Sequence, residues 1–211
     1  MSLNAAARLA GMFEEISAAI AQQKDLLTEL DGAIGDGDHG ITMSIGFSAV
    51  TAHLTRRDLS SMSAGELMRA AASAFLNAVG ASTGPLYATG FRRAADALSA
   101  DKLELEDAAA MIVAITTGIR ERGKGDRGEK TMLDAWYPAA EAAQAAMKAG
   151  KDPNHFWKLV VEAAEAGAQA TRSMLATKGR ASRVGERAIG HIDPGAASAV
   201  IILKAMSRAL N

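Results

Sequence analysis

The chain has 211 residues, which is enough for one large domain or two small ones. Its formal net charge is −1, so composition gives no reason to expect nucleic acid or an acidic membrane as a partner. It contains no cysteine, which excludes disulfides, thiolate nucleophiles and cysteine-based metal sites. The N-terminus lacks a signal pattern and no apolar run approaches roughly 18 residues, so we expect a cytoplasmic protein with no membrane contact.

The composition predicts an all-α protein, because alanine is abundant, aromatic residues make up only 4% and alternating β-branched stretches are nearly absent. Ser63 and Glu66 have the spacing of a capping box. Asp152-Pro153 and Asp193-Pro194 each combine an N-cap with a proline at the first helical position. Pro138 predicts a kink or a late start in the sixth helix. The eight expected helices cover about residues 5–30 (ended by Gly32), 41–54, 64–79, 85–98, 105–120, 131–148, 153–177 and 194–211.

The strongest feature is an acidic turn in which Asp31, Asp36 and Asp38 lie within eight residues, separated by glycines and followed by His39-Gly40. Glycine allows tight folding, and converging carboxylates require a cation, for which hard oxygen ligands favour Mg²⁺ or Ca²⁺. The turn lacks the glutamate of an EF-hand, and the chain has no Walker A loop. Because a helix is expected after Gly40, its free amides would favour phosphate. The alternative is an acidic surface turn in which Asp38 caps that helix.

Three further loops are rich in glycine or arginine, at residues 80–85, 121–131 and 178–194. The first precedes a helix and offers hydroxyls, and the last carries Arg180, Arg183 and Arg187, whose guanidinium groups bind phosphate bidentately. Each loop by itself also fits an ordinary solvated connection.

Taken together, these segments resemble one family, the L subunits of dihydroxyacetone kinases, also called the DAK2 or DhaL domain. The matching blocks follow the family's order along almost the whole chain: Asp31-x4-Asp36-Gly-Asp38-His39-Gly40, Gly84-Pro85-Leu86-Tyr87, Gly128-Glu-Lys-Thr-Met-Leu-Asp134, Lys178-Gly-Arg-Ala-Ser182, Gly185-Glu-Arg187 and Ile189-Gly-His-x-Asp-Pro-Gly195. One block would be modest evidence, whereas all of them in order are specific.

The resemblance implies that residues 1–211 form a single domain, a barrel of eight antiparallel helices with ADP or ATP at one end. It implies that Asp31, Asp36 and Asp38 hold two Mg²⁺ ions. The nucleotide phosphates would be lined by His39, Gly40, Ile41, Thr42, Ser82 and Thr83. Gly123 and Met132 would lie near the adenine, and Arg180 with Asp193, Pro194 and Gly195 would close the pocket.

The implied function is phosphoryl transfer to a short-chain ketose held on a separate K subunit, so the chain alone would be inactive and no catalytic residue is assigned. ATP exchanges freely in one mode; in the other, bound ADP is rephosphorylated by a phosphotransferase-system M subunit. Two alternatives remain: a binding module read by a transcription regulator, and the ATP domain of a fatty-acid kinase, which normally continues into further domains.

Several positions depart from the family's usual pattern: Thr42, Ser82-Thr83, Glu129 and Arg183. None of them is one of the three aspartates, so the departures bear on the closing contacts and on the acceptor. Related kinases act on four-carbon ketoses such as erythrulose, and this chain is a candidate for that activity.

Overall fold

The computed structural model describes residues 4–80, 82–98 and 102–211, and within these ranges the chain contains nine α-helices and no strand. The prediction of an all-α protein is therefore confirmed. Four short 3₁₀ turns lie between the helices. The helices are α1 (Ala5–Gln22), α2 (Lys24–Ile34), α3 (His39–Leu54), α4 (Ala64–Ala78), α5 (Thr83–Ala97), α6 (Leu105–Gly123), α7 (Leu133–Lys148), α8 (Pro153–Ala170) and α9 (Pro194–Leu210).

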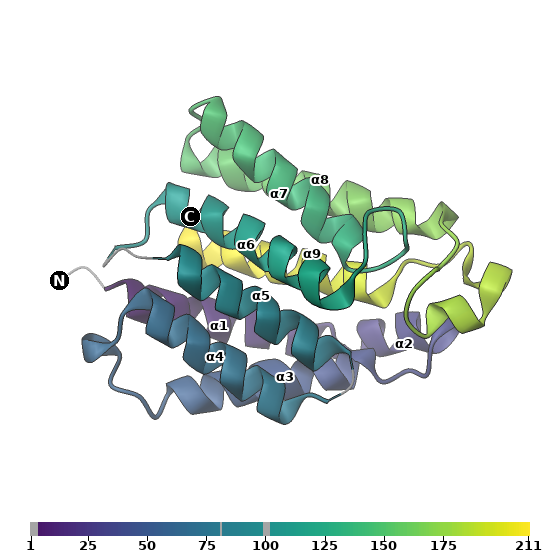
Figure 1. Ribbon diagram of the computed structural model, residues 1–211, viewed down its shortest axis with the longest axis horizontal. Coiled ribbons are helices and arrows are strands. Elements are labelled where there is room, and N and C mark those ends of the chain that lie inside the picture. Colours follow the sequence, from purple (N-terminus) through teal and green to yellow (C-terminus); the bar gives the residue numbers. More distant parts are fainter. Residues whose placement is uncertain (1–3, 81, 99–101) are drawn as a thin grey trace.

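Eight of these helices form a closed ring in which each packs against the next. The order around the ring is α1, α3, α4, α5, α6, α7, α8 and α9, and α9 returns to α1. The short helix α2 lies outside the ring and extends from one end of the barrel, on the side opposite both termini (Figure 1). The predicted eight-helix barrel is thus confirmed, with α2 as an additional helix that packs chiefly on α3 and α9.

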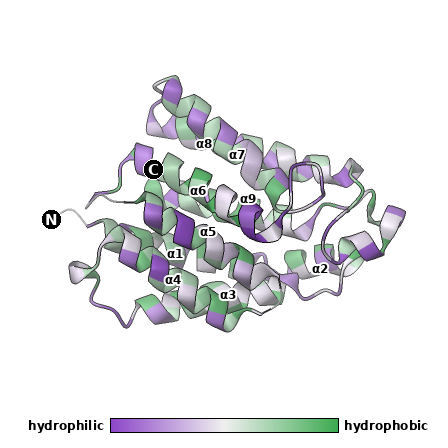
Figure 2. Ribbon diagram, viewed as in Figure 1, coloured by the Kyte–Doolittle hydropathy of each residue, from purple (hydrophilic) through white to green (hydrophobic). Residues whose placement is uncertain are grey.

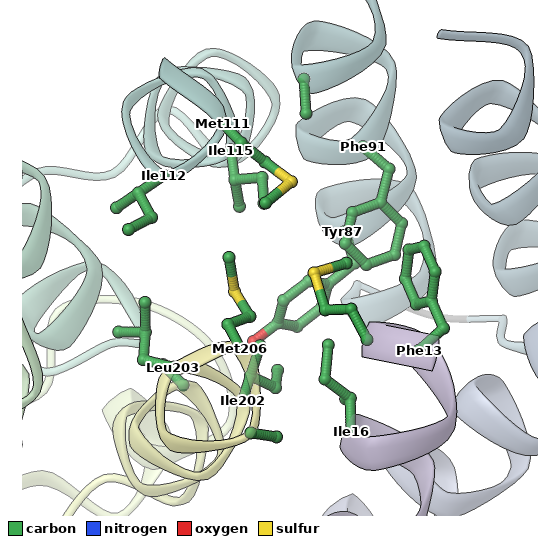
Figure 3. Packing of buried hydrophobic residues seen from close by; sticks show 14 of the residues in the cluster. Phe13, Ile16, Tyr87, Phe91, Met111, Ile112, Ile115, Ile202, Leu203 and Met206 are labelled. Carbon is green, nitrogen blue, oxygen red and sulfur yellow. The ribbon is translucent and has the colours of Figure 1, made fainter. Parts of the chain in front are cut away.

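Hydrophobic and hydrophilic residues are interspersed along the helices (Figure 2), and buried apolar residues from all the ring helices form the core. Side chains from α1, α5, α6 and α9 meet at its centre, among them Phe13, Phe91 and Met206 (Figure 3). Phe13 and Phe91 pack edge to face with ring centroids 5.4 Å apart. Buried alanines on most of the helices let the backbones approach closely, so the core closes with few aromatic rings.

Two of the expected helix boundaries are wrong. The segment expected to be one helix over 5–30 is divided at Gln23, whose backbone N–H still bonds Ala19 while the chain turns to direct α2 out of the ring. Gly32 does not end this segment, because α2 continues to Ile34 and Gly35 follows it. The helix expected to reach residue 177 ends at Ala170, where a 3₁₀ turn over Thr171–Ser173 begins.

Local sequence signals at other helix ends behave as predicted. Ser63 and Glu66 form the reciprocal hydrogen bonds of a capping box at the start of α4. Asp152 and Asp193 cap α8 and α9, each with a proline at the next position. The helix α7 runs through Pro138 and starts at Leu133, slightly later than expected. Among the described helices, none combines the length and the apolar character that crossing a membrane would require.

Candidate functional site

The acidic turn joins α2 to α3 at the open end of the barrel, and Asp31 organises it. The Asp31 carboxylate lies in the last turn of α2 and accepts hydrogen bonds from the backbone N–H of Asp38 (2.9 Å) and of His39 (3.2 Å). Asp31 therefore caps the start of α3, while the side chain of Asp38 makes no capping bond. The alternative in which Asp38 acts as the capping side chain is wrong.

Carboxylate oxygens of Asp31, Asp36 and Asp38 all lie within 4.8 Å of one another. Asp31 is buried and the other two are exposed. Partial desolvation, and then the charge of Asp31, raise the pKa of Asp38 above its ordinary value. Three hard oxygen donors at this spacing suit a divalent cation such as Mg²⁺. Gly35 has no room for a side chain, because a β-carbon there would overlap the Asp31 carboxylate.

A single guanidinium group faces two of these carboxylates. Arg180 forms an ion pair with Asp36 and lies 3.4 Å from Asp38. All three side chains are about half exposed, so solvent screens these pairs and each contributes little to folding stability. The arrangement instead shows that this part of the turn attracts positive charge.

His39 lies below the turn and is buried against α9. Its Nε2 lies 2.9 Å from the hydroxyl of Ser198, and that hydroxyl donates its only hydrogen to the Gly195 carbonyl. A ring proton on Nε2, donated to Ser198, satisfies both of these hydrogen bonds. Burial lowers the pKa of His39, which favours the neutral ring. Nδ1 is then left as an acceptor.

Gly40 fixes the close approach of α3 to α2. A β-carbon at this position would overlap the Lys24 carbonyl and lie 2.5 Å from the Thr28 hydroxyl. The backbone of α2 leaves no space for that carbon, so glycine is required here although its conformation is helical. The packing of α3 on α2 therefore fixes the relative position of the two helices that the acidic turn connects.

A cavity of about 710 Å³ opens beside the acidic turn, a size typical of small-molecule sites. The starts of α3, α5 and α9 all contribute to it, through His39, Thr83 and Pro194. Neither α3 nor α5 has a capping bond from the residue before it. At α3 the Asp38 and His39 amides bond to Asp31, whereas α5 has no side-chain cap, and amides left free at such a start attract anions.

Another wall of the cavity is apolar, and of its residues only Met132 was expected from the sequence. Its residues come from five helices, from the residue after α4 and from the end of the 124–132 loop: Ile45, Ala78, Val79, Leu86, Ile119, Met132 and Leu133. In the sequence, most of these positions look like ordinary core residues of amphipathic helices. A flat apolar ligand group such as a nucleobase suits this wall.

Residues 174–192, which we call the arginine loop, cover one side of the cavity. Two 3₁₀ turns, Ala181–Arg183 and Gly185–Ala188, shape the loop. Its own small apolar cluster buries Ala176 and Ala188 against Ile34 of α2. The loop supplies Lys178 and Arg180 to the cavity lining.

A buried polar cluster of Lys130, Asp134 and Asp193 lies beside the cavity, and Lys130 and Asp193 belong to its lining. The Asp134 carboxylate accepts hydrogen bonds from the N–H of Gly128 (2.5 Å) and of Thr131 (2.8 Å), which fixes the 124–132 loop. Asp193 accepts one from Ala196 N–H (2.7 Å), and burial raises its pKa to about 7. Burial also lowers the pKa of Lys130, against the opposing effect of the Asp193 and Asp134 charges.

Thirteen of the fifteen residues expected from the sequence line this single cavity. They are Asp31, Asp36, Asp38, His39, Thr42, Ser82, Thr83, Gly123, Met132, Arg180, Asp193, Pro194 and Gly195. Gly40 is buried behind the turn, and Ile41 is half exposed on α3, so neither belongs to the lining. Ala81, in the loop before α5, lies outside the described residues.

An all-helical barrel with a carboxylate triad, helix N-termini and an apolar wall around one cavity has the features of a site for a metal ion and a phosphorylated ligand. Comparison with known proteins specifies the family. The DAK2 domain profile matches residues 33–208. The chain therefore belongs to the DAK2 domain family, in the group of the L subunits of dihydroxyacetone kinases.

Two curated relatives and one solved structure support this assignment. The chain is 38% identical over 193 residues to the ADP-binding subunit DhaL of PEP-dependent dihydroxyacetone kinase 2 from Listeria innocua serovar 6a, covering 91% of this chain and 89% of that protein. It is 38% identical over 192 residues to the corresponding Escherichia coli K12 subunit, covering 89% of each. The dihydroxyacetone kinase from C. freundii, crystallised with AMP-PNP and Mg²⁺, superposes with a TM-score of 0.71 at 27% identity. That match covers 98% of this chain and 34% of the longer kinase chain.

Proposed function

We propose that the chain is the nucleotide-binding subunit of a dihydroxyacetone-type kinase, carrying a phosphoryl group on ADP to a short-chain ketose held by a separate K subunit. The observation that carries the proposal is the convergence of Asp31, Asp36 and Asp38 at the edge of a cavity of nucleotide size. The relatives named as ADP-binding subunits and the C. freundii complex with AMP-PNP and Mg²⁺ support it.

In this proposal the three aspartates hold two Mg²⁺ ions, which when bound neutralise phosphate charge during transfer. Asp31 keeps its carboxylate in place through the amides of Asp38 and His39. The starts of α3 and α5, with Thr42, Ser82 and Thr83, surround the phosphates. His39 can donate a hydrogen bond to them only if its ring rotates or is protonated, because its Nδ1 is otherwise an acceptor. Arg180, released from its carboxylate partners, is placed to donate to phosphate oxygens.

The adenine would lie against the apolar wall, between Gly123, Met132 and Leu86, with little polar recognition of the base. A β-carbon at Gly123 would come within 2.9 Å of the Leu86 side chain, so the missing side chain leaves space at this wall. Asp193, Pro194 and Gly195 would bound the pocket below the phosphates. Gly40 acts by packing α3 on α2, and Ile41 lies on the surface beside the site.

The relatives' names support a particular phosphoryl source and acceptor. Both curated relatives above are named as subunits of PEP-dependent kinases, which supports rephosphorylation of bound ADP by a phosphotransferase-system M subunit. Dihydroxyacetone is the acceptor in those names, and a four-carbon ketose such as erythrulose is the other candidate. Phosphoryl transfer depends mainly on positioning and charge neutralisation, so this chain needs no sugar-binding group of its own.

Two measurements test the proposal. Native mass spectrometry of the purified protein should show one tightly held ADP, and an empty, freely exchanging site would contradict the carrier mode. The protein is then mixed with a K subunit, a phosphorylated M subunit and either dihydroxyacetone or erythrulose. Ketose phosphate should form only when all components are present, and the two ketoses are compared by kcat/KM. Failure with both ketoses would contradict the kinase role.

A further inference from the structure

The two ends of the arginine loop are held together at its base. The Gly190 N–H donates to the Arg172 carbonyl (2.7 Å), and the Asp193 N–H donates to the Thr171 hydroxyl (2.9 Å). That hydroxyl is completely buried and in turn donates to the Ala168 carbonyl at the end of α8 (2.6 Å). The loop therefore leaves and re-enters the fold at one point, where α8 ends and α9 begins.

The buried side chain of Lys130 contacts both of the chain segments that meet at this base. Its ammonium Nζ donates to the Thr171 carbonyl and to the His191 carbonyl, each at 2.5 Å. These acceptors stand at opposite ends of the arginine loop. The lysine is only 1% exposed although lysine side chains are rarely buried, and its backbone takes the left-handed conformation with φ of 59°. A left-handed backbone and a buried charge are each unfavourable, so their presence at one residue indicates that the surrounding contacts hold Lys130 in this position.

The neighbouring residue, Glu129, extends the contact along the loop. The carbonyl of Glu129 accepts a hydrogen bond from the Thr177 N–H (3.3 Å), and its carboxylate lies 3.7 Å from the Lys178 ammonium. On its far side, the loop touches the acidic turn only through exposed charges and the small cluster around Ile34. The buried hydrogen bonds of the loop are thus concentrated at its base.

We infer that Lys130 is a positioning residue that fixes both ends of the arginine loop and so holds Arg180 over the acidic turn, slowing the release of bound nucleotide. The effect on nucleotide release rests on the proposed function, whereas the effect on the loop does not. An ammonium ion bonds two carbonyls from different segments at once, and a methionine of similar length removes both bonds. The His191 carbonyl then loses this donor, and the Thr171 carbonyl keeps only the Met174 N–H (3.2 Å).

Hydrogen exchange of the nucleotide-free protein tests the first part. In Lys130→Met, amides of residues 174–192 should exchange at least tenfold faster, while α1 and α4 keep their protection. Lys130→Arg retains the charge and the donors and should restore most of the protection. Lys158→Met, which removes an exposed lysine on α8, is the matched control and should leave the loop unchanged. Unchanged loop exchange, or an equal rise throughout the barrel, would overturn the assignment. If Lys130→Met does not fold, Lys130→Gln, which removes the charge but keeps a polar side chain, decides by the same local comparison.

Release of a fluorescent ADP analogue in the presence of Mg²⁺ tests the second part. Lys130→Met should release it at least tenfold faster than the wild type, and Lys130→Arg should lie close to the wild type. A mobile loop with an unaltered release rate would refute the link between Lys130 and nucleotide retention. A wild-type protein that binds no nucleotide would overturn the proposed function, and the exchange experiment would still decide the role of Lys130 in the loop.

Discussion

Replacing Asp36 by asparagine tests two effects of the carboxylate triad: repulsion between its charges in the metal-free protein, and its binding of Mg²⁺ and ADP. The carboxylate oxygens lie within 4.8 Å of one another. At that distance two like charges repel by about 0.9 kcal/mol in a medium like water and about 3.5 kcal/mol at an effective dielectric constant of 20. Asp36 is about half exposed, so the lower figure applies, and it is offset by the screened pair with Arg180. Without metal, the free energy of unfolding should therefore change by less than about 1 kcal/mol.

Binding of Mg²⁺ and ADP should respond in the opposite way. Loss of a residue that only supports a metal ligand costs about 10–100-fold in affinity, so loss of a ligand should raise the Kd about 100-fold or more. At a ligand concentration of about 100 times the wild-type Kd, binding stabilises the wild type by about 2.7 kcal/mol, and the variant by only about 0.4 kcal/mol. For a chain of this size, these values correspond to increases in Tm of about 5–11 °C and about 1–2 °C.

The assay combines calorimetric titration with thermal unfolding, each with and without Mg²⁺ and ADP. Asp96→Asn is the matched control, because Asp96 is also exposed and paired with an arginine, Arg69, but lies away from the cavity. An Asp36→Asn protein that binds Mg²⁺ and ADP as tightly as the control would refute the metal assignment. A fall of several kcal/mol in metal-free stability would refute the reasoning about screening.

Two further perturbations concern packing and pH. Gly40→Ala should lower the free energy of unfolding by about 1–3 kcal/mol or more in chemical denaturation, because its β-carbon would overlap the backbone of α2. Gly11→Ala, at a helical position with no atom within 4 Å, should instead stabilise by about 0.5–1 kcal/mol, and equal effects of the two variants would contradict this account. Burial raises the pKa of Asp193 to about 7, so between about pH 4 and about pH 7 the folded chain holds a proton that the unfolded chain has lost. The stability of the wild type should therefore fall across this window, by at most about 4 kcal/mol from this group. Asp193→Asn keeps an N-cap oxygen, and its stability, measured by urea unfolding without ligand, should lack that pH dependence. If the free energies of unfolding of the two proteins differ by a constant amount from pH 4 to pH 8, Asp193 titrates normally and this account is wrong.

The sequence by itself determined the features that depend on neighbouring residues. The capping box at Ser63, the aspartate-proline starts of α8 and α9 and the glycine-rich acidic turn all satisfy local backbone requirements, and each occurs where it was expected. Because the site motifs lie in loops at helix starts, their order along the chain and the family resemblance placed thirteen of the residues that line the cavity.

Only the tertiary structure decided which side chains meet across the barrel. No glycine or proline marks the break at Gln23; it accompanies the departure of α2 from the ring to pack on α3. The helix α8 stops at Ala170 because Thr171 bonds to Asp193, which is 22 residues away. The apolar wall and the role of Lys130 depend on contacts between segments distant in the chain, which no local pattern encodes.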